Sequence, residues 1–150
     1  METSSYSFES ETAKNNFEAI LAIFKNTETN QDKYKIILEL GSKKFLFPDN
    51  EKIESNLVPG CQSIVYLHAN KAENGTIFFS YFSEALISSG LAYLATQTYS
   101  HLSPEEILKT PPFFIEHLGL AHSLTPGRSN GVMSMVNVLK KMALNFIIKR

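Results

Sequence analysis

Two short segments, Gln62-Ser63-Ile64-Val65-Tyr66-Leu67-His68-Ala69 and Thr76-Ile77-Phe78-Phe79-Ser80-Tyr81, decide the fold of this chain. Both are rich in β-branched and aromatic residues, which favour strands. Asn74-Gly75 between them is a loop signal, so we expect an antiparallel hairpin. Residues 49–57 lead into the first strand as a polar, extended segment, and we expect them to add a short edge strand.

Two helices are predicted ahead of the hairpin. Apolar residues at helical spacing predict the first over residues 11–25, and these residues are Phe17, Ile20, Leu21 and Phe24. Ser10 or Thr12 is its expected N-cap. The second helix carries Tyr34, Ile37 and Leu38 on one face. Gly41 is expected to end it in the left-handed conformation.

Four helices are predicted after the hairpin, over residues 84–100, 104–109, 112–118 and from 126 onward. Ser83 is the expected cap of the first, and Gly90 within it should permit a close backbone approach. The capping box Ser103-Pro104-Glu105-Glu106 starts the second. Gly119 should stop the third, and residues 120–124 should form a loop.

The predicted order of elements is two helices, a small antiparallel sheet of about three strands, and four helices. This order is typical of an α+β fold with segregated elements. We expect residues 1–150 to form a single domain, with residues 1–9 as a flexible, Ser-rich tail. No stretch approaches about 18 consecutive apolar residues, so no membrane span is expected. The N-terminal residues lack the features of a signal peptide.

Composition excludes several classes of site. Lys and Arg total 14 against 15 Asp and Glu, which argues against a broad nucleic-acid interface. Cys61 is the only cysteine, so the chain has no internal disulfide, zinc site of several thiolates or usual iron–sulfur ligand set. A lone thiol favours a reducing, cytoplasmic compartment. The four histidines show no ligand spacing of the metalloprotease kind.

The turn Val58-Pro59-Gly60-Cys61-Gln62-Ser63 is the most chemically specific feature of the sequence. A free cysteine is commonly a buried apolar filler. Here Gly60 gives the backbone freedom before the thiol, and polar residues follow it, which favours a reactive thiol. No Lys, Arg or His lies within five residues of Cys61. Activation must therefore come from residues that the fold brings near, or from a partner.

A stand-alone Cys-dependent enzyme is one function compatible with this turn. His101, His117 or His122 could act as the base of a Cys–His transferase. A thiol peroxidase is disfavoured, because Val58 stands where those enzymes place Thr or Ser. No second cysteine is present to resolve a sulfenic acid.

Arg128 lies in a second unusual stretch, a polar and Gly-bearing helix start at residues 124–131. It is the only arginine before the terminal Arg150. Such a residue is commonly solvated. Its planar guanidinium also suits recognition of an anion or a partner.

Four blocks of the sequence together resemble the SufE family of sulfur acceptors. The blocks are residues 33–41, 58–66, 83–91 and 122–131, and the resemblance covers residues 15–145. Gly127 stands where that family usually has Ser, and Tyr66 where it usually has Trp. The resemblance implies a helix-covered small sheet like that of SufE and of the IscU scaffold proteins.

The resemblance also implies a function, as a sulfur-transfer accessory protein rather than an enzyme. Cys61 would accept persulfide sulfur from a pyridoxal-phosphate-dependent, SufS/CsdA-like cysteine desulfurase, stimulate that enzyme, and pass sulfur to a downstream iron–sulfur scaffold complex. No metal or cofactor of its own is expected. A cluster-binding scaffold is a further alternative that the lone thiol disfavours. The candidate partner-binding residues are Gly60, Gln62, Ser63, Glu84, His122 and Arg128.

Overall fold

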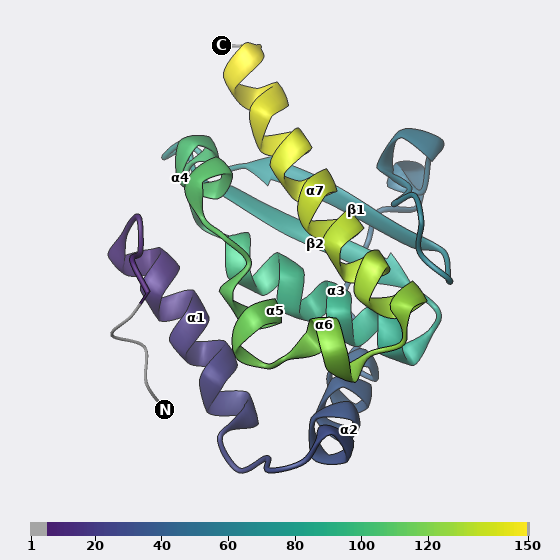
Figure 1. The fold of residues 1–150 in the computed structure, drawn as a ribbon. Helices are drawn as coiled ribbons and strands as arrows, with labels where there is room; N and C mark the ends of the chain where they lie inside the picture. The colour runs from purple at the N-terminus through teal and green to yellow at the C-terminus, as the bar shows by residue number, and fades with distance from the viewer. Residues whose placement is uncertain (1–5, 150) are drawn as a thin grey trace.

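The computed structural model describes residues 6–149 as an α+β fold in which helices cover a two-stranded antiparallel sheet (Figure 1). The elements are α1 (Glu11–Phe24), α2 (Asn30–Gly41), η1 (Asp49–Glu51), η2 (Glu54–Asn56), β1 (Val65–Lys71), β2 (Ile77–Ser83), α3 (Leu86–Tyr99), α4 (Pro104–Lys109), α5 (Phe113–His117), α6 (Leu120–Ser123) and α7 (Pro126–Ile148). The predicted fold class is confirmed.

The predicted hairpin is confirmed, with both strands displaced toward the C-terminus. Val65 lies opposite Ser83, and Lys71 lies opposite Ile77. Burial alternates along β2, so alternate residues face the helices. The inward-facing residues are Ile77, Phe79, Tyr81 and Ser83. The other face of the hairpin is less covered. The segment that follows α2 lies against it, where the ring centroids of Phe47 and Tyr66 are 6.4 Å apart.

The predicted edge strand at residues 49–57 is wrong, and within residues 6–149 the sheet has two strands rather than about three. The segment folds into the two 3-10 turns η1 and η2. The Asn56 amide donates to the backbone carbonyl of Glu51 at 2.8 Å and to its carboxylate at 2.9 Å. Such local side-chain bonds compete with strand pairing. Only Leu57 pairs with the sheet, through a single bridge to Tyr66.

Helix α3 is the centre of the core, and glycines let α2 approach it closely. A Cβ atom at Gly90 would overlap the backbone carbonyl of Ile37, so the close approach predicted at Gly90 is confirmed. The left-handed stop predicted at Gly41 is wrong. Gly41 is the last residue of α2, and a Cβ there would overlap the carbonyl oxygen of Leu86. It is therefore needed for packing between helices rather than for a turn.

Two predicted features around the later helices are also wrong. Ser83 does not cap α3, because it belongs to the ladder opposite Val65, and Ala85 is the N-cap instead. Residues 120–124 are not simply a loop, since α6 occupies most of them. Among the residues that the structure describes, five α-helices therefore follow the sheet instead of four. Gly119, with φ of 66°, ends α5 as predicted and turns the chain into α6.

The last helix, α7, packs against α3, α4 and β1. Its buried stripe is Gly131, Val132, Met135, Val136, Leu139 and Ala143. By length and composition alone this helix of 23 residues could cross a membrane, a test that core helices of soluble proteins also pass. Its apolar stripe is used here against the other elements of the fold.

Residues 1–5 of the predicted flexible tail lie outside the described residues. Tyr6 and Phe8 pack on an aromatic cluster with Phe17 of α1 and Phe113 of α5. The ring centroids of Tyr6 and Phe17 are 5.3 Å apart, and those of Phe8 and Phe113 are 5.2 Å apart. This cluster ties the segment before α1 to α5.

Candidate functional site

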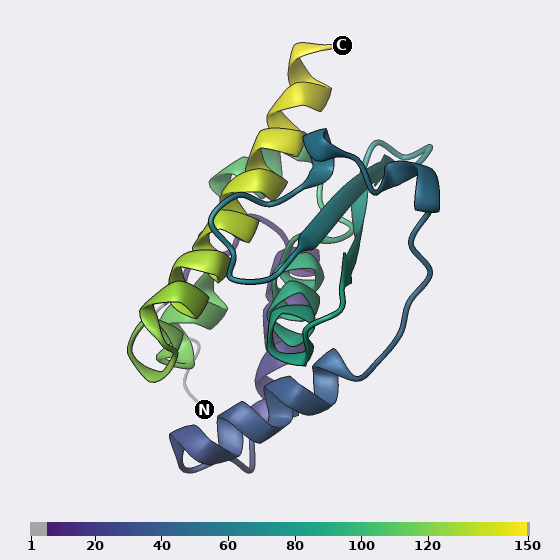
Figure 2. The same cartoon turned by 90° about the vertical axis from the view of Figure 1, so that its right-hand side faces the viewer.

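Cys61 lies at the tip of a closed loop that leads into β1. The backbone N–H of Val58 donates to the carbonyl of Val65 at 2.9 Å, which closes the loop at its base. Within the loop, Gly60 has φ of 77°. This left-handed conformation strains residues that carry a Cβ. The prediction that Gly60 supplies backbone freedom beside the thiol is therefore confirmed. Figure 2 shows the loop running beside α7 before it enters β1.

The loop packs on two glycines of α7 that share one face of the helix. Gly127 and Gly131 are four residues apart, which places them one turn apart on the same side. A Cβ at Gly131 would lie 3.3 Å from Cys61 Sγ, and a Cβ at Gly127 would lie 2.6 Å from Gln62 Cδ. The two glycines therefore make room for two consecutive residues of the loop.

The Cys61 thiol is half-buried, and its burial favours the protonated form. Its Sγ lies 3.7 Å from the carbonyl oxygen of Gly131, to which the S–H can donate a weak hydrogen bond. Burial raises the pKa of the thiol above its ordinary value, because desolvation disfavours the thiolate. The isolated chain therefore holds Cys61 mainly as a thiol at neutral pH, and the nucleophilic form requires a change in its surroundings.

Within residues 6–149, no histidine forms a hydrogen bond with Cys61, whose one polar contact is Gly131. His117 contacts Tyr6 through a hydrogen bond of 3.3 Å between Nδ1 and the phenol oxygen, and His122 is exposed on α6. The Cys–His arrangement of a stand-alone enzyme is thus not assembled around the thiol. In the same residues, no group of three or more His, Cys, Asp or Glu side chains could hold a metal ion.

The other predicted partner-binding residues fall in three places. Gly60, Gln62 and Ser63 belong to the Cys61 loop. Glu84 is exposed directly after β2. Since Val65 pairs with Ser83, the Cys61 loop enters the sheet at the end where Glu84 leaves it.

Arg128 lies beside this loop on the first turn of α7. Its guanidinium carbon is 5.7 Å from the ring centroid of Tyr34 on α2, which positions the side chain over an aromatic face. His122 instead borders a separate depression formed by α5 and α6, together with Pro112 and Ile115. The structure therefore brings Gln62 and Arg128 to the same end of α7, and it places His122 apart from the loop.

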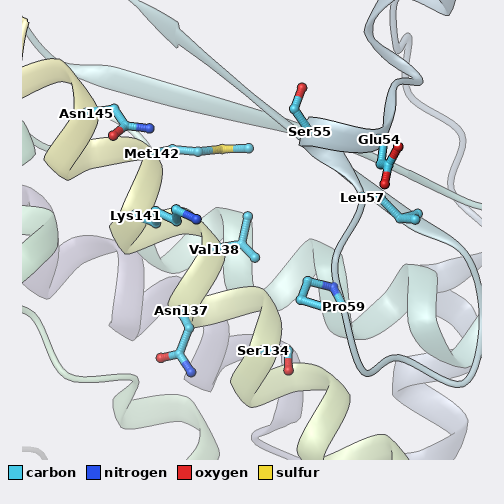
Figure 3. A pocket seen from close by; sticks show the side chains of 10 residues that line it. All are labelled: Glu54, Ser55, Leu57, Pro59, Ser134, Asn137, Val138, Lys141, Met142 and Asn145. Carbon is cyan, nitrogen blue, oxygen red and sulfur yellow. The ribbon is translucent and has the colours of Figure 1, made fainter.

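A groove of about 620 Å³ on the other flank of the Cys61 loop escaped the sequence interpretation (Figure 3). One wall is formed by residues 54–59, and the other by α7 from Ser134 to Asn145. Gly131 and Gly127 were also missed as site residues. Their four-residue spacing in a helix was visible in the sequence, but the loop that packs on them was not.

Comparison with known proteins gives the family. The family described as "SufE: Fe-S metabolism associated domain" matches residues 18–143. An uncharacterised SufE-like protein of Synechocystis is 34% identical over 131 residues, which are 87% of this chain and 82% of that protein. The cysteine desulfuration protein SufE of Plasmodium falciparum is 35% identical over 115 residues, or 74% of this chain.

The chain covers less than half the length of two relatives, the Plasmodium protein and a protein of Arabidopsis thaliana. It covers 46% of the Plasmodium protein. It covers 35% of the Arabidopsis thaliana SufE-like protein 1, chloroplastic/mitochondrial, to which it is 30% identical over 130 residues, 87% of this chain.

A solved structure supports the same fold. A hypothetical protein from Thermus thermophilus has a TM-score of 0.69 and 24% identity, and the match covers 89% of this chain and 96% of that one. The family match over most of the chain and the sequence relatives confirm the resemblance read from the four sequence blocks. This chain belongs to the SufE family, whose domain is associated with iron–sulfur metabolism.

Proposed function

We propose that this chain is a sulfur acceptor, which takes persulfide sulfur from a pyridoxal-phosphate-dependent cysteine desulfurase onto Cys61 and passes it on for iron–sulfur cluster assembly. One observation carries the proposal most directly. The only thiol of a SufE-family chain is held at the tip of a loop, half-buried against Gly131, with no base beside it in the described residues. A carrier needs this kind of thiol, because the reactive sulfur is made elsewhere.

The transfer step is an exchange between two thiols. The Cys61 thiolate attacks the terminal sulfur of the persulfide on the desulfurase cysteine. A new S–S bond forms at Cys61, the old S–S bond breaks, and the desulfurase cysteine leaves as a thiolate. The proton released by Cys61 balances the one that the desulfurase cysteine takes up. No external oxidant or reductant is required.

Docking must also activate the thiol, since burial raises its pKa in the free chain. A partner that draws the loop away from α7 would expose Cys61 and lower that pKa toward its ordinary value. Only the complex then presents a thiolate, so the free carrier is protected from other oxidants and electrophiles. Stimulation of the desulfurase follows in this scheme, because the carrier removes the sulfur that blocks the next turnover.

The proposed desulfurase-docking surface is the end of the fold where the Cys61 loop meets Glu84 and Arg128. Gly60, Gln62 and Ser63 are assigned to the loop itself, and the two charged residues would pair with opposite charges on the partner. His122 belongs to the same family motif as Arg128. Its position on α6 gives it the weakest support of the set.

The test is a mass measurement after incubation with the cysteine desulfurase of the same organism and free cysteine. We expect the intact mass to rise by one sulfur atom, the added sulfur to map to Cys61, and desulfurase turnover to increase. Cys61→Ser is the matched control and should show neither effect. No mass gain together with unchanged turnover would refute the proposal. Thiol-transfer activity without any desulfurase would favour a stand-alone Cys-dependent enzyme instead.

A further inference from the structure

The groove between α7 and residues 54–59 opens directly beside the Cys61 loop. Pro59 lines it, and a Cβ at the neighbouring Gly60 would lie 3.4 Å from Ser134 Oγ on the facing helix. Val138 and Met142 point from α7 toward the wall formed by residues 54–59 (Figure 3). A second depression of about 250 Å³ shares Ser55, Met142 and Asn145 with the first, so the groove continues along α7.

The shape of the groove suits an extended polypeptide. From Gly131, which touches Cys61, to Asn145 the helix advances about 21 Å. About six residues of extended chain span that distance. The thioether of Met142 on the inner surface can adapt to different apolar side chains.

The polar groups of the groove are unpaired and suit a peptide backbone. Asn137, Lys141 and Asn145 follow one another at intervals of four residues, so they form a row along α7. Among residues 6–149 these three side chains make no hydrogen bond or ion pair with the chain, whereas the adjacent Lys140 donates to the carbonyls of Leu108 and Thr110. An amide can donate to and accept from a backbone whatever the sequence of the peptide.

The groove and the proposed desulfurase-docking surface lie on opposite flanks of Cys61. Arg128 precedes Gly131 on α7, and the groove residues from Ser134 onward follow it. One partner could therefore occupy the Arg128 side while the groove remained open. A carrier with one thiol must bind a sulfur donor and a sulfur acceptor in turn. Separate surfaces on the two sides of Cys61 allow each partner to bind at its own surface.

We propose that this groove binds an extended segment of the downstream sulfur acceptor, with its reactive cysteine at the Cys61 end and an acidic side chain facing Lys141. This inference rests on the proposed function. The acceptor thiolate attacks the terminal sulfur of the Cys61 persulfide. An S–S bond forms on the acceptor, the S–S bond at Cys61 breaks, and Cys61 leaves as a thiolate that takes up a proton, with no net change in oxidation state.

The position of the acidic side chain follows from the helix. Lys141 is ten residues beyond Gly131 along α7, about 15 Å along the axis. An extended chain covers that distance in about four or five residues. The exposed Lys141 ammonium is the cation on the helix wall at that point, opposite the loop wall that carries Glu54. An acidic residue about four or five positions from the acceptor cysteine therefore meets Lys141.

The experiment uses defined peptide thiols in place of the acceptor. Cys61 is first converted to its mixed disulfide with N-acetylcysteine amide. This disulfide is then equilibrated with acetyl-Cys-Ala-Ala-Ala-Glu-Glu-Ala-amide, or with the reversed sequence that ends in cysteine, in competition with free N-acetylcysteine amide, so that each exchange forms one S–S bond and breaks one. The ratio of the two mixed disulfides at Cys61 is read by intact mass. No desulfurase is present, so the outcome is independent of the test of sulfur acceptance.

We expect one of the two peptides to be preferred over the amide by about tenfold, as a few backbone hydrogen bonds and one ion pair can supply. Asn145→Ala and Lys141→Glu should each reduce the preference severalfold. With a peptide that carries Lys-Lys in place of Glu-Glu, the preference over N-acetylcysteine amide should be larger for Lys141→Glu than for the wild-type chain. Asn15→Ala and Lys25→Glu, at exposed positions of α1 and its end, are the matched controls and should keep the wild-type preference.

Three outcomes would overturn the proposal. The first is a preference below about twofold for both peptides, which means that only the thiol is recognised. The second is a preference that the groove variants leave unchanged, which places the peptide elsewhere. The third is a concentration-dependent dimer that Lys141→Glu dissociates, since the groove would then be filled by a second copy of this chain.

Discussion

The Sγ atom of Cys61 lies 3.7 Å from the carbonyl oxygen of Gly131, a residue 70 positions further along the chain. A Cβ at position 131 would approach the same sulfur to 3.3 Å, which is tighter than ordinary van der Waals contact. The missing side chain of one glycine thus determines how deeply the thiol sits. This depth in turn sets its exposure and its pKa.

Gly131→Ala should therefore make Cys61 more reactive without unfolding the chain. The added methyl group pushes the sulfur outward, while Ala in place of a helical Gly contributes about 1 kcal/mol of helix stability. We expect the free energy of unfolding to stay within about 1 kcal/mol of wild type. The rate of Cys61 alkylation by iodoacetamide should rise severalfold. The neighbouring exposed residue gives the control, since Asn130→Ala should alkylate at the wild-type rate. An unchanged rate in Gly131→Ala would mean that the loop already has room for the methyl group.

The pH dependence of alkylation should report the buried thiol. Because burial raises the pKa of Cys61, the thiolate fraction at pH 7 is smaller than that of an exposed thiol, whose pKa is about 8.5. The alkylation rate should rise with pH through a midpoint above that of the same chain unfolded in urea. The folded-to-unfolded rate ratio should be smallest at neutral pH and increase as pH rises. A folded midpoint at or below the unfolded one would contradict the half-buried position of the sulfur.

Two helical glycines should respond differently to the same substitution. In Gly90→Ala the new Cβ overlaps the backbone carbonyl of Ile37, so α2 and α3 must separate. We expect a loss of about 2–4 kcal/mol in the free energy of unfolding, despite the higher helix propensity of Ala. In Gly127→Ala the nearest atom is the movable end of Gln62, so the change should stay within about 1 kcal/mol. Urea denaturation of both variants measures the difference. Equal losses would show that the α2–α3 contact can relax.

Local chemistry made much of the fold predictable. The Ser10 hydroxyl accepts a hydrogen bond from the Ala13 N–H at 3.1 Å, and the Ser103–Glu106 capping box has both of its bonds. Both signals act within four residues. The same reasoning failed at Ser83, because pairing with the distant Val65 holds it in the ladder before it can cap a helix. It failed at Gly41 for a similar reason, since the residue that requires a glycine there lies on another helix.

The candidate site likewise has features that local sequence predicted and features that only the tertiary structure revealed. The Cys61 turn was evident from Gly60 and the lone thiol. Arg128 was evident from its polar, Gly-bearing helix start, and the family resemblance added its docking role. The contact between Cys61 and Gly131 joins parts of the chain that no local pattern connects. The groove likewise needs residues 54–59 and α7 side by side. Burial of the thiol, and hence the direction of its pKa, therefore came only from the tertiary structure.

Arg128 offers a test of the proposed desulfurase-docking surface that separates charge from position. Arg128→Ala removes the guanidinium and its contact with the Tyr34 ring, 5.7 Å away. A cation–π pair that keeps contact with solvent, as this half-buried pair does, contributes about 1 kcal/mol, so the fold should persist. If the charge meets an opposite charge on the desulfurase, the concentration for half-maximal stimulation should rise about tenfold. Arg128→Lys should recover part of the effect, since it keeps the charge but not the planar fork.

Tyr34→Leu complements these variants, because it retains Arg128 and removes the ring that positions it. A smaller rise in the half-maximal concentration is expected for Tyr34→Leu than for Arg128→Ala, because the guanidinium can still reach the partner from a less ordered position. Turnover of the desulfurase at sub-saturating concentrations of each variant measures both effects. Wild-type stimulation by Arg128→Ala would remove Arg128 from the docking surface. Equal losses in Arg128→Ala and Tyr34→Leu would instead show that the held geometry of the guanidinium, rather than its charge alone, is what the partner recognises.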